Sequence, residues 1–450
     1  MDFGKAGFEQ IITHKGGGGD CECGREHATG LVFASIRPGA TDDVPEALSK
    51  IGITRPFVVC DENTYKAAWP ALEAVLAKAR VGYALYTLRG GRVEPDERSI
   101  GSLTMAFDRR CDGIIGVGAG TINDCCKVLA GAAGVPFMIY ATAPSMDGYA
   151  SNLSSMLRDG VKVSLYNACP AAIIGDIDIV RGAPLRMLWA GFGDMAAKYV
   201  SICEWRIAHI VTGEYYCENI AGLVRAAVAK IMQNARKLAE RDPDAVQAVM
   251  EGLVLSGVAM SFATVSRPAS SLEHSFSHVW EMSAHSRGEA SDLHGIQVGI
   301  GTLLSLKTLE HLREVSPDRE KALGFVAALT NERWEAQTRK VFGESAQTLI
   351  DAEYKSYHKN DPLRHAARLE RICEYWRDIT RVIDEELPPS GVVEGLMREL
   401  GMPVTPGDIG VKPDDVLAAF VGSRDIRDKY LSSSLIWDLG LLYEDWGMLS

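Results

Sequence analysis

The chain has 450 residues, 47% of them hydrophobic, which is ordinary for a globular protein of about two to three domains. The net charge is −12 and no basic run is present, so we expect neither nucleic acid nor an anionic membrane as a partner. Residues 1–15 lack the apolar segment of a signal peptide. The longest uncharged stretch, 128–146, is interrupted by glycines and prolines, so we expect no membrane span.

The ten cysteines occur mostly within apolar segments, which predicts reduced thiols in a cytoplasmic protein. Near the N-terminus, Cys21, Cys23 and His27 form a C-x-C-x3-H cluster beside the glycines at 16–19. A structural zinc site normally needs four ligands, and this cluster has three. We therefore interpret residues 1–30 as a flexible head with incidental thiols.

The next part of the chain alternates between short apolar strands and helices, which is typical of a parallel sheet with crossover helices. Strands are predicted over 31–36, at the edge of the sheet, and over 56–60, 83–88, 113–117, 136–140, 161–165 and 171–175. Helices are predicted over 64–80 and 97–109 and from 122 onward. After residue 185 long helices predominate, over 188–210, 218–241, 245–264, 273–285, 295–311 and in several further segments. This pattern predicts an α/β domain at 31–183 and an all-α domain at 184–450.

A turn with almost no side chains follows the strand predicted at 113–117: Gly118, Ala119, Gly120 and Thr121. The next helix begins at Ile122. Such a turn lets backbone N–H groups approach a phosphate, and the helix N-terminus adds partial positive charge. A hydroxyl-rich loop at 142–151 follows the neighbouring strand. Because the carboxyl ends of neighbouring parallel strands form a crevice, we expect a pyrophosphate-containing cofactor there.

Asp61 stands at the end of another predicted strand, at 56–60. A carboxylate there can accept hydrogen bonds from a cofactor ribose and would repel a 2′-phosphate, which favours NAD over NADP. The same residue is equally suited to cap the following helix. The sequence leaves both roles open.

Three histidines and one aspartate are candidates for a metal site. His274 and His278 are four residues apart on a predicted helix and share one face. His294 stands directly before Gly295 at the expected start of the next helix, and Asp194 lies on an earlier one. One carboxylate and two imidazoles would leave a coordination position open, as in a catalytic divalent site. Surface histidine pairs have the same spacing, so spacing alone does not decide.

The segments GVGAGTIND and TAPSMDGYAS, and later GFGDMAAKY, SRPASSLEHSFSHVWEM and LHGIQVGIGT, resemble the sn-glycerol-1-phosphate dehydrogenase family, especially its bacterial branch. This family belongs to the superfamily of iron-type alcohol dehydrogenases and dehydroquinate synthases. The resemblance covers most of the chain. It implies a Rossmann-like nucleotide-binding domain followed by an all-α metal-binding domain, as in the dehydroquinate synthase-like fold.

The resemblance also assigns roles to individual residues. It implies that Asp194, His274 and His294 bind the metal and that His278 faces the substrate. Asp147 is implied to accept a hydrogen bond from a substrate hydroxyl, with an Asx turn as the alternative. The implied cofactor contacts come from Asp61, Gly118, Ala119, Gly120, Thr121, Ile122, Thr142, Ala143, Pro144, Ser145 and Ser151.

The function implied is the reversible reduction of dihydroxyacetone phosphate to sn-glycerol 1-phosphate in phospholipid metabolism, by a cytoplasmic homodimer. The cofactors would be NAD(P)H, with NAD favoured, and one divalent metal, zinc or nickel, although iron and cobalt also fit the ligands. One alternative is a polyol dehydrogenase of the same superfamily without phosphate preference. Others are a dehydroquinate-synthase-like cyclase that recycles its NAD and a non-catalytic, metal-stabilised homologue.

Overall fold

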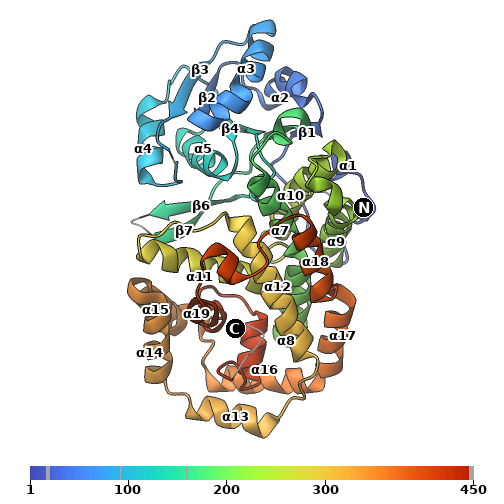
Figure 1. The fold of residues 1–450 in the computed structure, drawn as a ribbon, viewed down its shortest axis with the longest axis vertical. Coiled ribbons are helices and arrows are strands. Elements are labelled where there is room, and N and C mark those ends of the chain that lie inside the picture. The colour runs from blue at the N-terminus through green and yellow to red at the C-terminus, as the bar shows by residue number, and fades with distance from the viewer. Residues whose placement is uncertain (17–20, 92, 159–160, 445–450) are drawn as a thin grey trace. The chain divides into compact units, whose positions relative to one another are not determined.

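The computed structural model describes residues 1–16, 21–91, 93–158 and 161–444 and divides into two compact units (Figure 1). Unit 1 comprises Met1–Met195 and Cys217–Ala269, and unit 2 comprises Ala196–Tyr216 and the residues from Ser270 onward. The domain ranges 31–183 and 184–450 remain a prediction. The compact units differ from these predicted domains mainly because residues 217–269, predicted in the all-α domain, belong to unit 1. The predicted head 1–30 includes α1 (Phe8–Ile12), and its residues 17–20 lie outside the described residues.

Unit 1 is built on a six-stranded parallel sheet with the strand order β1-β8-β5-β4-β2-β3. Its strands are β1 (Phe33–Arg37), β2 (Pro56–Asp61), β3 (Ala84–Leu88), β4 (Gly113–Gly118), β5 (Phe137–Ala141) and β8 (Ala172–Asp176). The predicted α/β class is confirmed, and so is the edge position of the first strand. The ends of β2, β4 and β5 lie beside one another because these strands are adjacent and parallel.

One of the predicted strands lies outside the six-stranded parallel sheet. The segment predicted at 161–165 is β7 (Val161–Tyr166), and it pairs antiparallel with β6 (Leu153–Arg158) in a separate two-stranded sheet. The sequence did not predict β6 because a segment reading LSSMLR has few of the residues that favour strands.

Helices cover both faces of the parallel sheet. On one face, α2 (Val44–Ile51) and α3 (Glu62–Lys78) pack on alternate strand residues such as Ile115. Gly116 faces the other side, where a Cβ atom would lie 3.1 Å from Cys126 Sγ on α5 (Gly120–Ala133). The remaining helix among the first strands is α4 (Glu97–Ala106), which ends before the predicted Arg109.

Helix α10 (Pro243–Ala263) packs beside α9 (Glu218–Asn234) in unit 1. It is long and apolar enough to cross a membrane, since its most apolar 18-residue segment has a mean hydropathy of 1.5. However, 78% of that segment is buried inside the protein. Buried core helices have the same composition, so this feature is weak evidence for a membrane span.

The polar loop 142–151 packs directly against the backbone of two helices of unit 1. A Cβ atom on Gly191, in α7 (Leu185–Ala196), would lie 1.9 Å from the Pro144 carbonyl oxygen. One on Gly257, in α10, would lie 2.9 Å from the Ala150 amide nitrogen. Glycine is therefore required at both positions for the loop to approach the helices.

The described residues of unit 2 form helices joined by loops and include no strand. Its helices are α8 (Lys198–Thr212), α11 (Leu272–Ser286), α12 (His294–Leu312), α13 (Arg319–Ala328), α14 (Asn331–Phe342), α15 (Ala346–Ala352), α16 (Pro362–Glu374), α17 (Trp376–Glu386), α18 (Ser390–Glu399), α19 (Pro413–Ser423) and α20 (Ser432–Asp438). The helix predicted at 188–210 is in fact two, α7 and α8, which are separated at Ala197.

Glu204 is a buried residue that caps two helices. Its side chain is 1% exposed. The carboxylate accepts hydrogen bonds from the backbone N–H of Leu272, at 3.3 Å, and of Ser432, at 3.0 Å. These are the first residues of α11 and α20, so one carboxylate satisfies the N-termini of two helices.

Candidate active site

The predicted glycine turn joins β4 to α5. Ala119 is the N-cap residue of α5, and its methyl side chain cannot cap the first backbone N–H groups of the helix. A Cβ on Gly118 would lie 2.5 Å from Ile122, and one on Gly120 would lie 3.3 Å from Met146. The glycines therefore allow close packing of the turn, and the uncapped N-terminus is suited to an anionic phosphate.

A buried lysine holds the loop 142–151 beside this turn. Lys127 Nζ donates hydrogen bonds to the carbonyl oxygens of Gly148, at 2.6 Å, and Leu153, at 3.1 Å. Burial lowers the pKa of Lys127. The backbone N–H of Thr142 donates to the Gly118 carbonyl at 3.1 Å, which joins the start of the loop to the turn.

The structure places the predicted cofactor residues of the turn and loop at the carboxyl ends of β4 and β5. Asp61 stands at the end of the adjacent β2 and caps α3, since its Oδ1 accepts from the N–H groups of Asn63 and Thr64, each at 2.8 Å. The capping alternative is therefore observed, and the ribose contact stays a prediction. The buried Ser151 hydroxyl bonds within its own loop, with the Gly148 carbonyl 3.1 Å away.

Asp147, in the loop 142–151, is hydrogen-bonded to the carboxylate of Asp194 through its backbone N–H. The backbone N–H of Asp147 donates to Asp194 Oδ2 at 3.0 Å, and Ser256 Oγ donates to Asp147 Oδ2 at 3.0 Å. Asp194 lies on α7, three residues after Gly191, and its side chain is fully buried. A carboxylate in such surroundings is stable only when it is hydrogen-bonded or bound to a cation.

Unit 2 brings the three predicted histidines together. His274 and His278 lie on α11, and His294 is the first residue of α12. The ring centroid of His294 lies 5.3 Å from that of His274 and 5.5 Å from that of His278. The three imidazoles therefore lie close together within this unit, while their role as metal ligands stays a prediction.

Two glutamates that the sequence analysis missed determine which nitrogen each histidine can offer. His274 Nδ1 lies 2.9 Å from Glu273 Oε1, and His294 Nδ1 lies 2.9 Å from Glu281 Oε1. An ionised carboxylate accepts hydrogen bonds, so each Nδ1 carries the proton and each Nε2 keeps its lone pair. Metal-binding histidines have this pairing, and the donor set fits a divalent ion. The available signal was local: Glu273 precedes His274, and Glu281 follows His278 by three residues.

A second set of ligands lies wholly within unit 2. The ligand atoms of His278, Glu281 and His294 lie within 4.8 Å of one another. Asp194 belongs to unit 1 and the histidines to unit 2, so joint coordination by Asp194, His274 and His294 stays a prediction.

The basic segment, residues 424–429 with two arginines and one lysine, lies beside His278. Arg427 Nη2 is 3.4 Å from His278 Nε2, and Lys429 Nζ donates to the Ser270 carbonyl at 2.8 Å. The Arg427 guanidinium therefore places one positively charged side chain directly beside His278.

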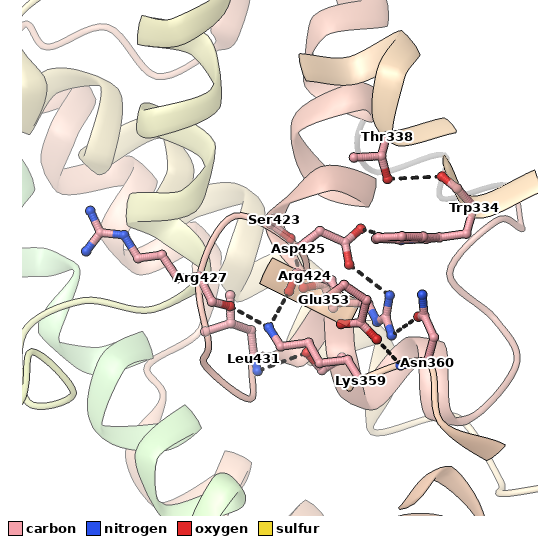
Figure 2. Close-up of polar contacts among 12 residues, drawn as sticks. Trp334, Thr338, Glu353, Lys359, Asn360, Ser423, Arg424, Asp425, Arg427 and Leu431 are labelled. Atoms are coloured by element: carbon pink, nitrogen blue, oxygen red, sulfur yellow. Dashed lines mark hydrogen bonds and ion pairs between the residues drawn. The ribbon is translucent and has the colours of Figure 1, made fainter. Parts of the chain in front are cut away.

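The backbone of the basic segment is held by Lys359 (Figure 2). Its ammonium donates to the carbonyl oxygens of Arg424, at 2.6 Å, of Lys429, at 3.2 Å, and of Arg427. Burial of the ammonium, together with the charge of Arg424, lowers the pKa of Lys359 to about 8. Figure 2 shows the Arg427 side chain directed away from Lys359, so one residue anchors the backbone and leaves the guanidinium to face His278.

Comparison with known proteins identifies the family. Residues 35–184 match the family model described as iron-containing alcohol dehydrogenase. A protein of Halalkalibacterium halodurans named glycerol-1-phosphate dehydrogenase (NAD(P)+) is 34% identical over 63% of this chain and 72% of its own length. The chain belongs to the glycerol-1-phosphate dehydrogenase family. A member of this family from Bacillus licheniformis is 28% identical over 94% of this chain and 93% of its own.

Solved structures show the same fold as this member of the glycerol-1-phosphate dehydrogenase family. Glycerol dehydrogenase from Schizosaccharomyces pombe has a TM-score of 0.60 at 16% identity, covering 92% of this chain and 89% of its own. A probable glycerol dehydrogenase from Sinorhizobium meliloti has a TM-score of 0.59 at 18% identity, covering 92% and 97%. The sequence-based assignment of family and fold is thereby confirmed.

The lowered pKa of Lys359 predicts a pH dependence of stability. From about pH 8 to the ordinary value of 10.5, the unfolded chain holds a proton that the folded chain has released, so stability rises with pH. The difference in unfolding free energy between the wild type and Lys359→Met should be level below about pH 7. It should then increase by at most about 1.4 kcal/mol per pH unit.

Lys355→Met is the matched control, because the Lys355 side chain is 72% exposed and pairs with Asp351 at the surface. Denaturant unfolding at each pH gives both curves. A Lys359 difference that stays level up to pH 10, or that falls, would show that the ammonium is not destabilised in the folded protein.

Proposed function

We propose that this protein reduces dihydroxyacetone phosphate reversibly to sn-glycerol 1-phosphate, with NAD(P)H and one divalent metal. The observation that carries the proposal is the pair of histidines whose Nδ1 atoms are held by carboxylates, which directs both Nε2 lone pairs to a ligand. Membership of the glycerol-1-phosphate dehydrogenase family supports the substrate and the nicotinamide cofactor.

NAD(P)H supplies the hydride when it is bound. The uncapped N-terminus of α5 would bind its pyrophosphate through backbone N–H groups. Asp61 uses Oδ1 to cap α3, and we propose that Oδ2 accepts from a ribose hydroxyl, which favours NAD. Thr142, Ala143, Pro144 and Ser145 would form the rest of the contact. Ser151 would contribute by positioning the loop, since its hydroxyl bonds to Gly148.

A divalent ion, zinc or nickel, would stabilise negative charge on the ketone oxygen when bound. We propose that Asp194, His274 and His294 hold it. Glu273 and Glu281 keep the two imidazoles in the tautomer that binds metal. His278 would hydrogen-bond to the substrate and supply the proton of the product hydroxyl, since imidazole titrates near neutral pH. Asp147, fixed by Ser256, would accept a hydrogen bond from another substrate hydroxyl.

Arg427 is the side chain we propose for the substrate phosphate. Its guanidinium lies beside His278, and a planar guanidinium can bind a phosphate through two parallel hydrogen bonds. Lys359 fixes the backbone from which Arg427 extends. This arrangement favours a phosphorylated triose over the unphosphorylated substrate of a polyol dehydrogenase. The homodimer, the cytoplasmic location and the role in phospholipid metabolism remain predictions.

The metal assignment predicts different losses for different residues. Turnover is measured as NADH or NADPH oxidation with dihydroxyacetone phosphate after chelation and re-addition of single metals, and bound metal is measured by mass spectrometry. His274→Ala and Asp194→Ala should lose metal and turnover together. His278→Ala should keep the metal and lose turnover by about 10²- to 10⁴-fold.

Glu281→Gln separates the two sets of ligands. If Glu281 acts only by hydrogen-bonding to His294, this variant should bind the metal about 10- to 100-fold more weakly. Its site should still fill completely at a high metal concentration. Full metal content in Asp194→Ala with none in Glu281→Gln would instead place the ion on His278, Glu281 and His294. A cyclase would show no net consumption of NADH, and a non-catalytic homologue would bind metal without oxidising NADH.

The proposed phosphate contact predicts a substrate-specific defect. Arg427→Ala should raise the KM for dihydroxyacetone phosphate by about 10-fold or more, because a charged hydrogen bond contributes about 1.5–3 kcal/mol. The KM for unphosphorylated dihydroxyacetone should not change. Arg398→Ala, at an exposed position on α18, is the control. Equal effects on both substrates would assign Arg427 a general role in folding or in orienting His278.

A further inference from the structure

The cysteine and histidine cluster of the N-terminal head gains a fourth member in the fold. Cys217, the N-cap residue of α9, is 1% exposed, and its Sγ lies 3.5 Å from Cys21 Sγ and 3.5 Å from His27 Nε2. Cys23 Sγ lies 3.3 Å from His27 Nε2. The ligand atoms of all four residues lie within 4.8 Å of one another, and all belong to unit 1. Cys217 is 190 residues beyond His27 along the chain, so the spacing within the head shows only three ligands.

These distances match the edges of a tetrahedral zinc site. Bonds of about 2.3 Å to sulfur and about 2.0 Å to nitrogen place two sulfurs about 3.8 Å apart and sulfur and nitrogen about 3.5 Å apart. A disulfide would require sulfurs about 2.0 Å apart. The Cys21 and Cys217 sulfurs, at 3.5 Å, are therefore spaced as neighbouring ligands and not as a disulfide.

The orientation of His27 is independent support for a ligand. Its ring is 3% exposed, and Nδ1 lies 3.2 Å from the Phe262 carbonyl oxygen. A carbonyl only accepts hydrogen bonds, so Nδ1 carries the proton and Nε2, which faces the cysteines, keeps its lone pair. The rings of Phe3 and Phe262 pack beside the imidazole and hold its plane.

The backbone brings the two head cysteines together through a tight turn. Gly24 has a φ of +72°, and its N–H donates to the Cys21 carbonyl at 2.9 Å. The same head packs on α9 near Cys217, where the Phe3 N–H donates to Asn219 Oδ1 at 2.7 Å. Ligands from the head and from the start of α9 therefore meet without rearrangement of either segment.

We propose that Cys21, Cys23, His27 and Cys217 bind one structural zinc ion that fastens the N-terminal head to α9. Thiolate ligands select zinc over hard cations such as magnesium and calcium. Four protein ligands close the coordination sphere, so this ion has no position for a substrate and its role is structural. The site shares no residue with the proposed catalytic centre and does not depend on the proposed function.

Cobalt substitution tests the site in the intact protein. Cobalt bound by thiolates produces a charge-transfer band in the near ultraviolet, whereas the proposed catalytic ligands are carboxylate and imidazole and produce none. Protein expressed with cobalt should show the band, and His274→Ala should retain it. Cys217→Ser should lose the band and one equivalent of metal per chain, while Cys373→Ser, at an exposed position on α16, should lose neither.

Alkylation of the wild-type protein keeps the test decisive if Cys217→Ser does not fold. Cys21 and Cys23 should resist iodoacetamide in the metal-loaded protein and react after removal of zinc with a chelator, as located by peptide mass spectrometry. A cobalt protein without the band, equal alkylation of both cysteines with and without chelator, or a Cys21–Cys217 disulfide in freshly purified protein would each overturn the proposal.

Discussion

The hydrogen bonds between carboxylates and histidine Nδ1 atoms are the interactions on which the proposed chemistry depends. A neutral imidazole has a lone pair on one nitrogen only, and Glu273 and Glu281 determine that this nitrogen is Nε2. Without them, both tautomers of His274 and of His294 would be populated. The free energy of metal binding would then be smaller, because binding would have to select one tautomer. The Phe262 carbonyl acts in the same way on His27, whose Nε2 faces the sulfur atoms of Cys23 and Cys217.

Buried charges that bind backbone groups position the segments that carry these side chains. Lys127 donates to carbonyls of the loop around Asp147, and Lys359 donates to carbonyls around Arg427. Glu204 accepts from the first amides of α11, the helix that bears His274, and of α20. A charge is costly to bury unless several polar partners surround it, so each of these residues stabilises its segment in one conformation.

Local patterns in the sequence predicted the parts of this structure that depend on local interactions. The alternating strands and helices of unit 1 and the placement of His274 and His278 on one helix follow from periodicity and spacing. The role of Glu204 and the meeting of Cys217 with the head did not, because each joins segments that are far apart along the chain. The β6–β7 pairing was missed because β6, with the sequence LSSMLR, has few of the residues that favour strands.

The proposed chemistry requires one divalent ion bound by Nε2 of His274, Nε2 of His294 and the carboxylate of Asp194. A crystal structure of the metal-loaded enzyme, with the ion located by anomalous diffraction, tests this directly. We expect all three ligand atoms about 2.0–2.2 Å from the ion, with Glu273 and Glu281 still hydrogen-bonded to the opposite nitrogens. An ion bound through Nδ1, or held by Glu281 in place of Asp194, would contradict the account.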